Sequence, residues 1–159
     1  MSPLTAETAS LCARCHAGAA GCKQHLLQLH NYWEAKRNRQ NFPRRTDIEP
    51  LELGFILPNL FLVDVLPGLE FRYRLTGTEV DEIHGINLTG KSPMDIRTPE
   101  VASLVQQQYE AALLDRRPRC DHLKLVGTDG SFWHYERLIL PLSEDGHTIN
   151  MLLGGIYLD

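Results

Sequence analysis

The sequence has no long apolar run, no cationic leader and no excess of basic residues. None of its apolar stretches approaches the roughly 20 residues that a helix needs to cross a bilayer, so we expect no membrane association. The first ten residues, MSPLTAETAS, carry neither a basic start nor an apolar segment, which argues against a secretory signal and predicts a cytoplasmic protein. A formal net charge of -4 argues against a general nucleic-acid binder, so we expect no nucleic-acid partner.

The familiar catalytic motifs are also missing. The sequence contains no G-x-S-x-G, no H-E-x-x-H and no P-loop. His134 and Glu136 lie two apart on a predicted strand and share a face, where such a pair can carry out acid–base chemistry or bind a metal. More often such a pair is a polar contact on the solvated face of a sheet. We therefore predict that the chain is not an enzyme, and an enzyme would need both residues in one charged pocket.

Cysteine is scarce, with four in the chain, and three of them lie near the start. The string Cys12-x-x-Cys15-His16 has the spacing that attaches c-type haem, but covalent attachment generally follows export, and with no export signal we do not expect haem. Cys12, Cys15, Cys22 and His25 also form a C-x2-C-x6-C-x2-H set that could complete a tetrahedral zinc site. The alternative is a flexible tail over residues 1–22 with reduced thiols, as expected in the cytosol.

The rest of the chain has the length and composition of one globular domain. Of its 159 residues, 43% are hydrophobic and 23% are charged. The predicted helices cover residues 23–40, 78–85 and 98–117. The longest begins with Thr98 as a cap and Pro99 at its first helical position. A further short helix is predicted within 47–56, with Asp47 as its cap.

Five strands are expected from alternation and from turn signals. They cover residues 60–65, 69–75, 120–126, 131–142 and 147–158. Pro67-Gly68, Asp129-Gly130 and Asp145-Gly146 mark the turns between them. The order, with two strands, then helices, then three strands, predicts an α+β fold: a five-stranded antiparallel sheet with helices on one face.

Six short motifs then point to a family. They are YW at 32–33, PRRTDIEP at 43–50, LPNLFLVDV from 57, FRYRLTGTEV from 71, LTGK at 88–91 and ERLILPLSEDG from 136. In this order they resemble a bacterial branch of small stand-alone PAS proteins, over roughly residues 26–158. Lys91 occupies a position at which that branch has Arg as often as Lys. The resemblance implies an N-terminal flanking helix over 23–42 and a PAS-like domain over 43–159, and it lends the Cys/His tail no support.

The resemblance implies a non-enzymatic sensory or signalling module that binds a small ligand or a partner protein between sheet and helices. Flavin photoreceptors of the superfamily carry a reactive cysteine in a region that corresponds to HGINLTGKSPMDI, residues 84–96, which has none. Haem-binding relatives often place a histidine on the long helix, which has none over 98–115. His84 is the nearest substitute, and a lone histidine there is more often a surface or capping residue. We therefore expect neither flavin nor haem.

A candidate cavity follows from the predicted inner face of the sheet. Its apolar lining would come from Phe61, Val63, Phe71, Tyr73, Tyr109, Trp133 and Met151, which could equally be plain core. Arg74 could bind a carboxylate-bearing metabolite there, or form a salt bridge with a residue such as Asp64. Arg137, on a later strand, raises the same question, since a buried arginine needs a carboxylate partner or a bound anion.

Two surfaces suggest partners. Leu26, Leu29 and Trp33 form an apolar stripe that would pack on the chain's own sheet or on a second copy, and the second option predicts a homodimer that Leu29→Asp should split. The basic run KRNRQNFPRR could contact an acidic partner, but the negative net charge favours a solvated helix end. The alternative function, from a different class, is a zinc-binding regulator that uses the N-terminal Cys/His cluster.

Overall fold

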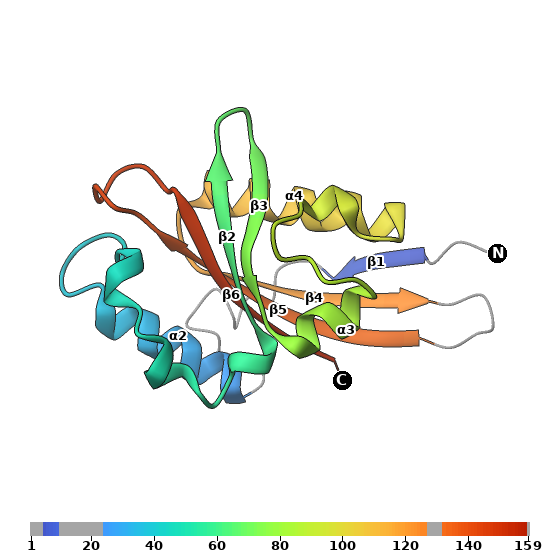
Figure 1. Ribbon diagram of the computed structural model, residues 1–159, viewed down its shortest axis with the longest axis horizontal. Coiled ribbons are helices and arrows are strands. Elements are labelled where there is room, and N and C mark those ends of the chain that lie inside the picture. Colours follow the sequence, from blue (N-terminus) through green and yellow to red (C-terminus); the bar gives the residue numbers. More distant parts are fainter. Residues whose placement is uncertain (1–4, 10–23, 127–131, 159) are drawn as a thin grey trace.

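The computed structural model describes residues 5–9, 24–126 and 132–158, and the side chains within 24–122 and 134–158 (Figure 1). Its centre is one antiparallel sheet with the strand order β1-β4-β5-β6-β2-β3. The strands are β1 Thr5–Ala9, β2 Leu60–Leu66, β3 Glu70–Thr76, β4 Arg119–Val126, β5 Phe132–Leu142 and β6 Met151–Leu158. The predicted five-stranded sheet is confirmed, and β1 adds a short sixth strand at its edge, from the segment that we predicted as a tail.

The last strand, β6, joins the first hairpin, β2 and β3, to the pair formed by β4 and β5. β2 and β3 are joined across Pro67-Gly68, where Gly68 takes a positive φ of 79°. β6 then lies between β2 and β5, so that Phe61 is opposite Gly154 and Arg137 is opposite Ile156. Because side chains alternate across a strand, this register fixes which residues of β5 and β6 face the same side.

Two helices cover one face of the sheet. α3, Thr78–His84, ends at Gly85, whose φ of 72° suits the left-handed position that terminates helices. α4, Pro99–Asp115, begins with proline at its first turn, as predicted, but the Thr98 side chain makes no capping hydrogen bond. α4 runs across the sheet and contacts β5.

The third helix, α2, Gln24–Lys36, packs on the opposite face. A Cβ atom on Gly155 would lie 2.8 Å from a methyl group of Leu26, so the helix sits directly on β6. The Trp33 indole N–H donates to the Pro141 carbonyl at 2.8 Å. Leu26, Leu29 and Trp33 are 0%, 0% and 1% exposed within the single chain. The stripe is therefore covered by the chain's own sheet, which removes the surface on which the homodimer hypothesis depended.

The segment before β2 differs from its prediction. The single helix expected within 47–56 is replaced by one short 3-10 helix, η2 Pro50–Leu53. Two further 3-10 helices flank it, η1 Arg45–Asp47 at the start of the predicted range and η3 Leu57–Asn59 just after its end. The physical reason is Pro50, because a residue before proline avoids the helical region. Glu49 accordingly is extended, and its carboxylate, rather than that of Asp47, accepts from the Leu51 N–H at 3.3 Å.

The last strand begins later than predicted, at Met151 instead of residue 147. The Asp145 carboxylate accepts hydrogen bonds from the backbone N–H groups of His147 at 2.8 Å and Thr148 at 2.7 Å, which holds this stretch as a loop. These donors lower the pKa of Asp145 to about 2. The predicted Asp129-Gly130 turn lies outside the described residues. Among the helices that are described, none has the length and apolar character needed to cross a bilayer.

Candidate functional site

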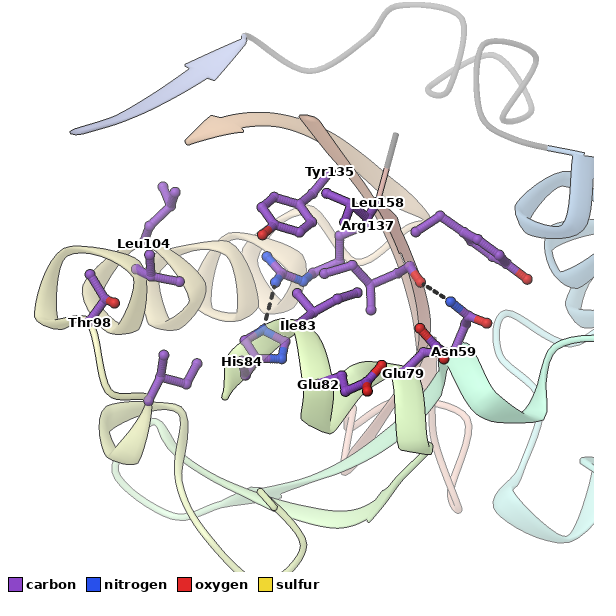
Figure 2. Close-up of a pocket in the computed structure, with 14 residues that line it drawn as sticks. Asn59, Glu79, Glu82, Ile83, His84, Thr98, Leu104, Tyr135, Arg137 and Leu158 are labelled. Carbon is purple, nitrogen blue, oxygen red and sulfur yellow. Dashed lines mark hydrogen bonds between the residues drawn. The ribbon is translucent and has the colours of Figure 1, made fainter. Parts of the chain in front are cut away.

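A cavity of about 790 Å³ lies between α3, the start of α4, the first half of β5 and the C-terminal end of β6 (Figure 2). Its apolar lining comes from Ile83, Ile96, Val101, Leu104, Ile156 and Leu158. Its polar lining comes from Asn59, Glu79, Glu82, His84, Thr98, Tyr135, Arg137 and Tyr157. The volume is within the range of about 300–1,000 Å³ that is typical of small-molecule sites.

Arg137 is the central polar residue of this cavity. Strand alternation puts it on the same face as Tyr135 and Ile139, towards α3 and α4. Its side chain is 2% exposed. Nη1 donates to the Gln108 amide oxygen at 2.6 Å, Nη2 donates to His84 Nε2 at 3.2 Å, and the Nε–H group has no hydrogen-bond partner among the described residues.

His84 is held in one tautomer. Its Nδ1 lies 2.7 Å from the Val80 carbonyl oxygen, which can only accept, so Nδ1 carries the hydrogen and Nε2 accepts from Arg137. Burial and the nearby Arg137 charge lower the pKa of His84 to about 4, so the imidazole is neutral at pH 7. The expected surface position of His84 is wrong, because the side chain is buried and turns into the cavity. The lone pair on Nε2 accepts the hydrogen bond from Arg137.

The predicted cavity residues lie mainly beside this cavity, in a packed group. We call Phe61, Phe71, Tyr73 and Tyr109 the aromatic cluster; their ring centroids are 5.5–6.4 Å apart in the contacting pairs. The two tyrosine hydroxyl groups bond each other at 2.8 Å. Burial raises the pKa of Tyr73 to about 12. The structure brings these four residues together, but as a filled core.

The remaining predicted cavity residues are dispersed. Val63 and Met151 are buried, and neither lines the 790 Å³ cavity. The Arg74 side chain is 58% exposed and forms an ion pair with Asp64 at 2.9 Å, which is the salt-bridge alternative. The Trp133 side chain lies outside the described residues. Ligand contact by the predicted set stays a prediction.

The described residues form neither the metal site nor the charged pocket that the zinc and enzyme hypotheses require. Cys12, Cys15 and Cys22 lie outside it, and the Nδ1 of His25 lies 2.9 Å from the Tyr157 hydroxyl oxygen. Within the described ranges, no three His, Cys, Asp or Glu residues are grouped to hold a metal. Glu136 lies 3.6 Å from His122, on the face of β5 away from Arg137, and neither Glu136 nor His134 lines the cavity.

The basic run is partly neutralised by acids near it. Lys36 pairs with Glu52 at 3.1 Å, and Arg37 pairs with Glu34 at 2.5 Å. The Arg45 side chain donates to the Ile48 carbonyl at 3.0 Å. These contacts agree with a solvated helix end, although they do not test nucleic-acid binding.

Sequence reasoning did not find the cavity. The sequence raises the question of a carboxylate partner or a bound anion for Arg137, but it assigns neither Tyr135, Gln108 nor the apolar start of α4 to a site. One signal was present: Arg137 occupies the inward position of a strand whose next inward residue is Ile139. A charge on the apolar face of a strand is costly, so such a position points to a buried polar site.

Comparison with known proteins identifies the fold family. The sequence model of a PAS domain family matches residues 22–157. No curated protein matches the sequence. Among solved structures, a Rhodobacter sphaeroides LOV protein is 16% identical with a TM-score of 0.47, over 63% of this chain and 58% of that protein.

Two further structures show the same level of likeness. A PAS domain from a Colwellia psychrerythraea protein is 10% identical with a TM-score of 0.45, over 65% of this chain and 86% of that domain. An RNA-binding light-oxygen-voltage receptor is 12% identical with a TM-score of 0.50, over 70% of this chain and 33% of the receptor. At these identities the likeness concerns the fold alone. The expectation that this chain holds no flavin stays a prediction.

Proposed function

The chain belongs to the PAS domain family, and from this premise we propose that it is a sensory domain that binds a small organic molecule in the cavity between α3, α4 and the ends of β5 and β6. The observation that carries the proposal is a cavity of about 790 Å³ that contains the buried and incompletely bonded side chain of Arg137. A filled core would leave neither the volume nor the unpaired donor.

The lining supports a ligand site rather than a packing fault. Apolar walls with a few convergent polar groups are what small-molecule sites present. Two of the polar lining groups, His84 on α3 and Arg137 on β5, are joined by a hydrogen bond, and Gln108 of α4, which does not line the cavity, accepts from Arg137. Glu79 and Glu82 are exposed and border the same cavity, so it is open to solvent on the α3 side.

The sheet offers a route from the ligand to a partner protein. Ile156 lines the cavity, and the next residue back along β6, Gly155, is covered by Leu26 of α2 on the opposite face. A ligand that moves β6 therefore moves the surface on which α2 packs. In this proposal a signalling partner reads the position of α2.

Native mass spectrometry of the untagged protein tests the proposal. We expect a non-covalent mass that leaves on denaturation, and we expect Val101→Trp, which fills the cavity, to lose it. Leu114→Trp is the matched control, because Leu114 lies on the same helix, is 84% exposed and does not line the cavity. A bare wild-type mass, combined with no thermal stabilisation of the wild type by any member of a metabolite library, would overturn the proposal.

A further inference from the structure

We infer that the cavity takes a small organic monocarboxylate with an apolar body, and that Arg137 binds its carboxylate group. This inference deepens the proposed function and rests on it.

The guanidinium of Arg137 is a buried charge without an ion pair. Arginine stays protonated in proteins, and a buried cation normally requires a carboxylate partner. Its hydrogen-bond partners, Gln108 and His84, are both neutral acceptors. No Asp or Glu in the described part of the chain forms an ion pair with Arg137. An anion is therefore the component that this site lacks.

One acid lies close by and is engaged through one of its two oxygens. Asp121 is opposite Arg137 in the β4–β5 register, so the two side chains leave the same face of the sheet. The Asp121 carboxylate accepts from Arg119 Nε at 2.9 Å, and Arg119 also pairs with Asp115 at 3.2 Å. Its other oxygen, Oδ1, has no hydrogen-bond partner among the described residues, so Asp121 moderates the local charge without forming an ion pair with Arg137.

The donors that remain suit a carboxylate. Arg137 has five N–H bonds, of which the structure uses one on each Nη atom, while its Nε–H is unpaired. Figure 2 places the guanidinium between the rings of Tyr135 and His84, inside the cavity. The Tyr135 hydroxyl makes no hydrogen bond within the described chain, so it is available as a second donor to the same anion.

The other walls restrict the rest of the ligand. Ile96, Val101 and Leu104 offer apolar contact for a hydrocarbon body. Glu79 and Glu82 border the cavity and add negative charge, which repels a second anionic group on the ligand. Tricarboxylates and organic phosphates therefore fit this lining less well than a monocarboxylate.

Isothermal titration calorimetry of the full chain at pH 7 tests the inference. The probes are octanoate, 4-phenylbutyrate and indole-3-acetate, each compared with its own primary amide. A hydrogen bond to a charged group contributes about 1.5–3 kcal/mol, so we expect at least one acid to bind about 10-fold or more tightly than its amide. Arg137→Met should abolish that preference, and Arg74→Met, which removes an exposed arginine outside the cavity, should keep it.

The outcomes separate the inference from the proposed function. Amides that bind as tightly as their acids would overturn the inference and leave the proposed ligand site intact. No binding by any acid, or tighter binding of citrate than of the monocarboxylates, would also overturn it, and the mass spectra would then decide the proposed function independently. Tyr135→Phe provides a second variant if Arg137→Met does not fold, with a few-fold loss expected for the acid alone.

Discussion

Two neighbouring regions on one face of the sheet, both covered by α4, are built in opposite ways. The aromatic cluster is filled, and its two polar atoms satisfy each other through the Tyr73–Tyr109 hydrogen bond. The cavity beside it keeps open volume, and its lining residue Arg137 has a buried Nε–H group without a partner in the described chain. Complete packing and complete pairing favour stability, whereas incomplete pairing around open volume leaves binding capacity.

Adjacent residues of α4 contribute to the two regions. Tyr109 is 1% exposed and belongs to the aromatic cluster, while Gln108 is 2% exposed and bonds Arg137. Successive helical residues point about 100° apart, so one helix can supply both environments at the same level. The difference between the regions therefore lies in the side chains and in what faces them, since the backbone element is shared.

The largest expected effect separates the two regions by stability. Phe61→Ala should lower the free energy of unfolding by about 3–5 kcal/mol, because it leaves a closed void in packed core beside Gly154. Leu104→Ala, on the cavity wall, should cost no more than about 1 kcal/mol, since that side chain already borders open volume. Urea unfolding followed by circular dichroism measures both, and equal losses would refute the contrast.

The next effect comes from the neutral imidazole of the cavity. Because the pKa of His84 is about 4 in the folded protein and near 6.5 when unfolded, the unfolded chain binds more protons between these values. Stability is therefore fully present above pH 6.5 and falls as the pH drops towards 4, by on the order of 3 kcal/mol.

Burial also lowers the pKa of His30, which contributes in the same direction, so the His84 share requires a variant. Unfolding curves of wild type and His84→Gln between pH 7 and pH 4 measure it. The variant should show a shallower pH dependence. A slope identical to that of the wild type would mean that His84 does not titrate in this way.

The smallest effect concerns single hydroxyl groups. Tyr73→Phe should cost about 1–3 kcal/mol because it leaves the buried Tyr109 hydroxyl unpaired, and adding Tyr109→Phe should recover much of that loss. Tyr135→Phe in the cavity should change stability by less than about 0.5 kcal/mol, since its hydroxyl bonds nothing in the described chain. A double-mutant cycle by denaturant unfolding gives the coupling, and additive losses would contradict a paired hydroxyl group.

Local sequence patterns predicted an element correctly where a single rule applied to it. Alternation at 69–75 and the Pro67-Gly68 turn predicted the first hairpin, and the start of α4 followed from Pro99. Where two local rules competed, the prediction was wrong: Asp47 is a good cap by residue type, but Pro50 forces the extended backbone one residue before it, at Glu49.

The sequence by itself determined the order of strands β2 to β6 and of helices α2 to α4, because hydrophobic periodicity, glycine and proline act over a few residues. Only the tertiary structure decided that the predicted cavity aromatics fill a core, that α2 buries its stripe on its own sheet, and that Arg137 meets His84 and Gln108. These contacts join residues 29 and 53 positions apart. Their position depends on strand register and on the path of α4 across the sheet, which no local pattern encodes.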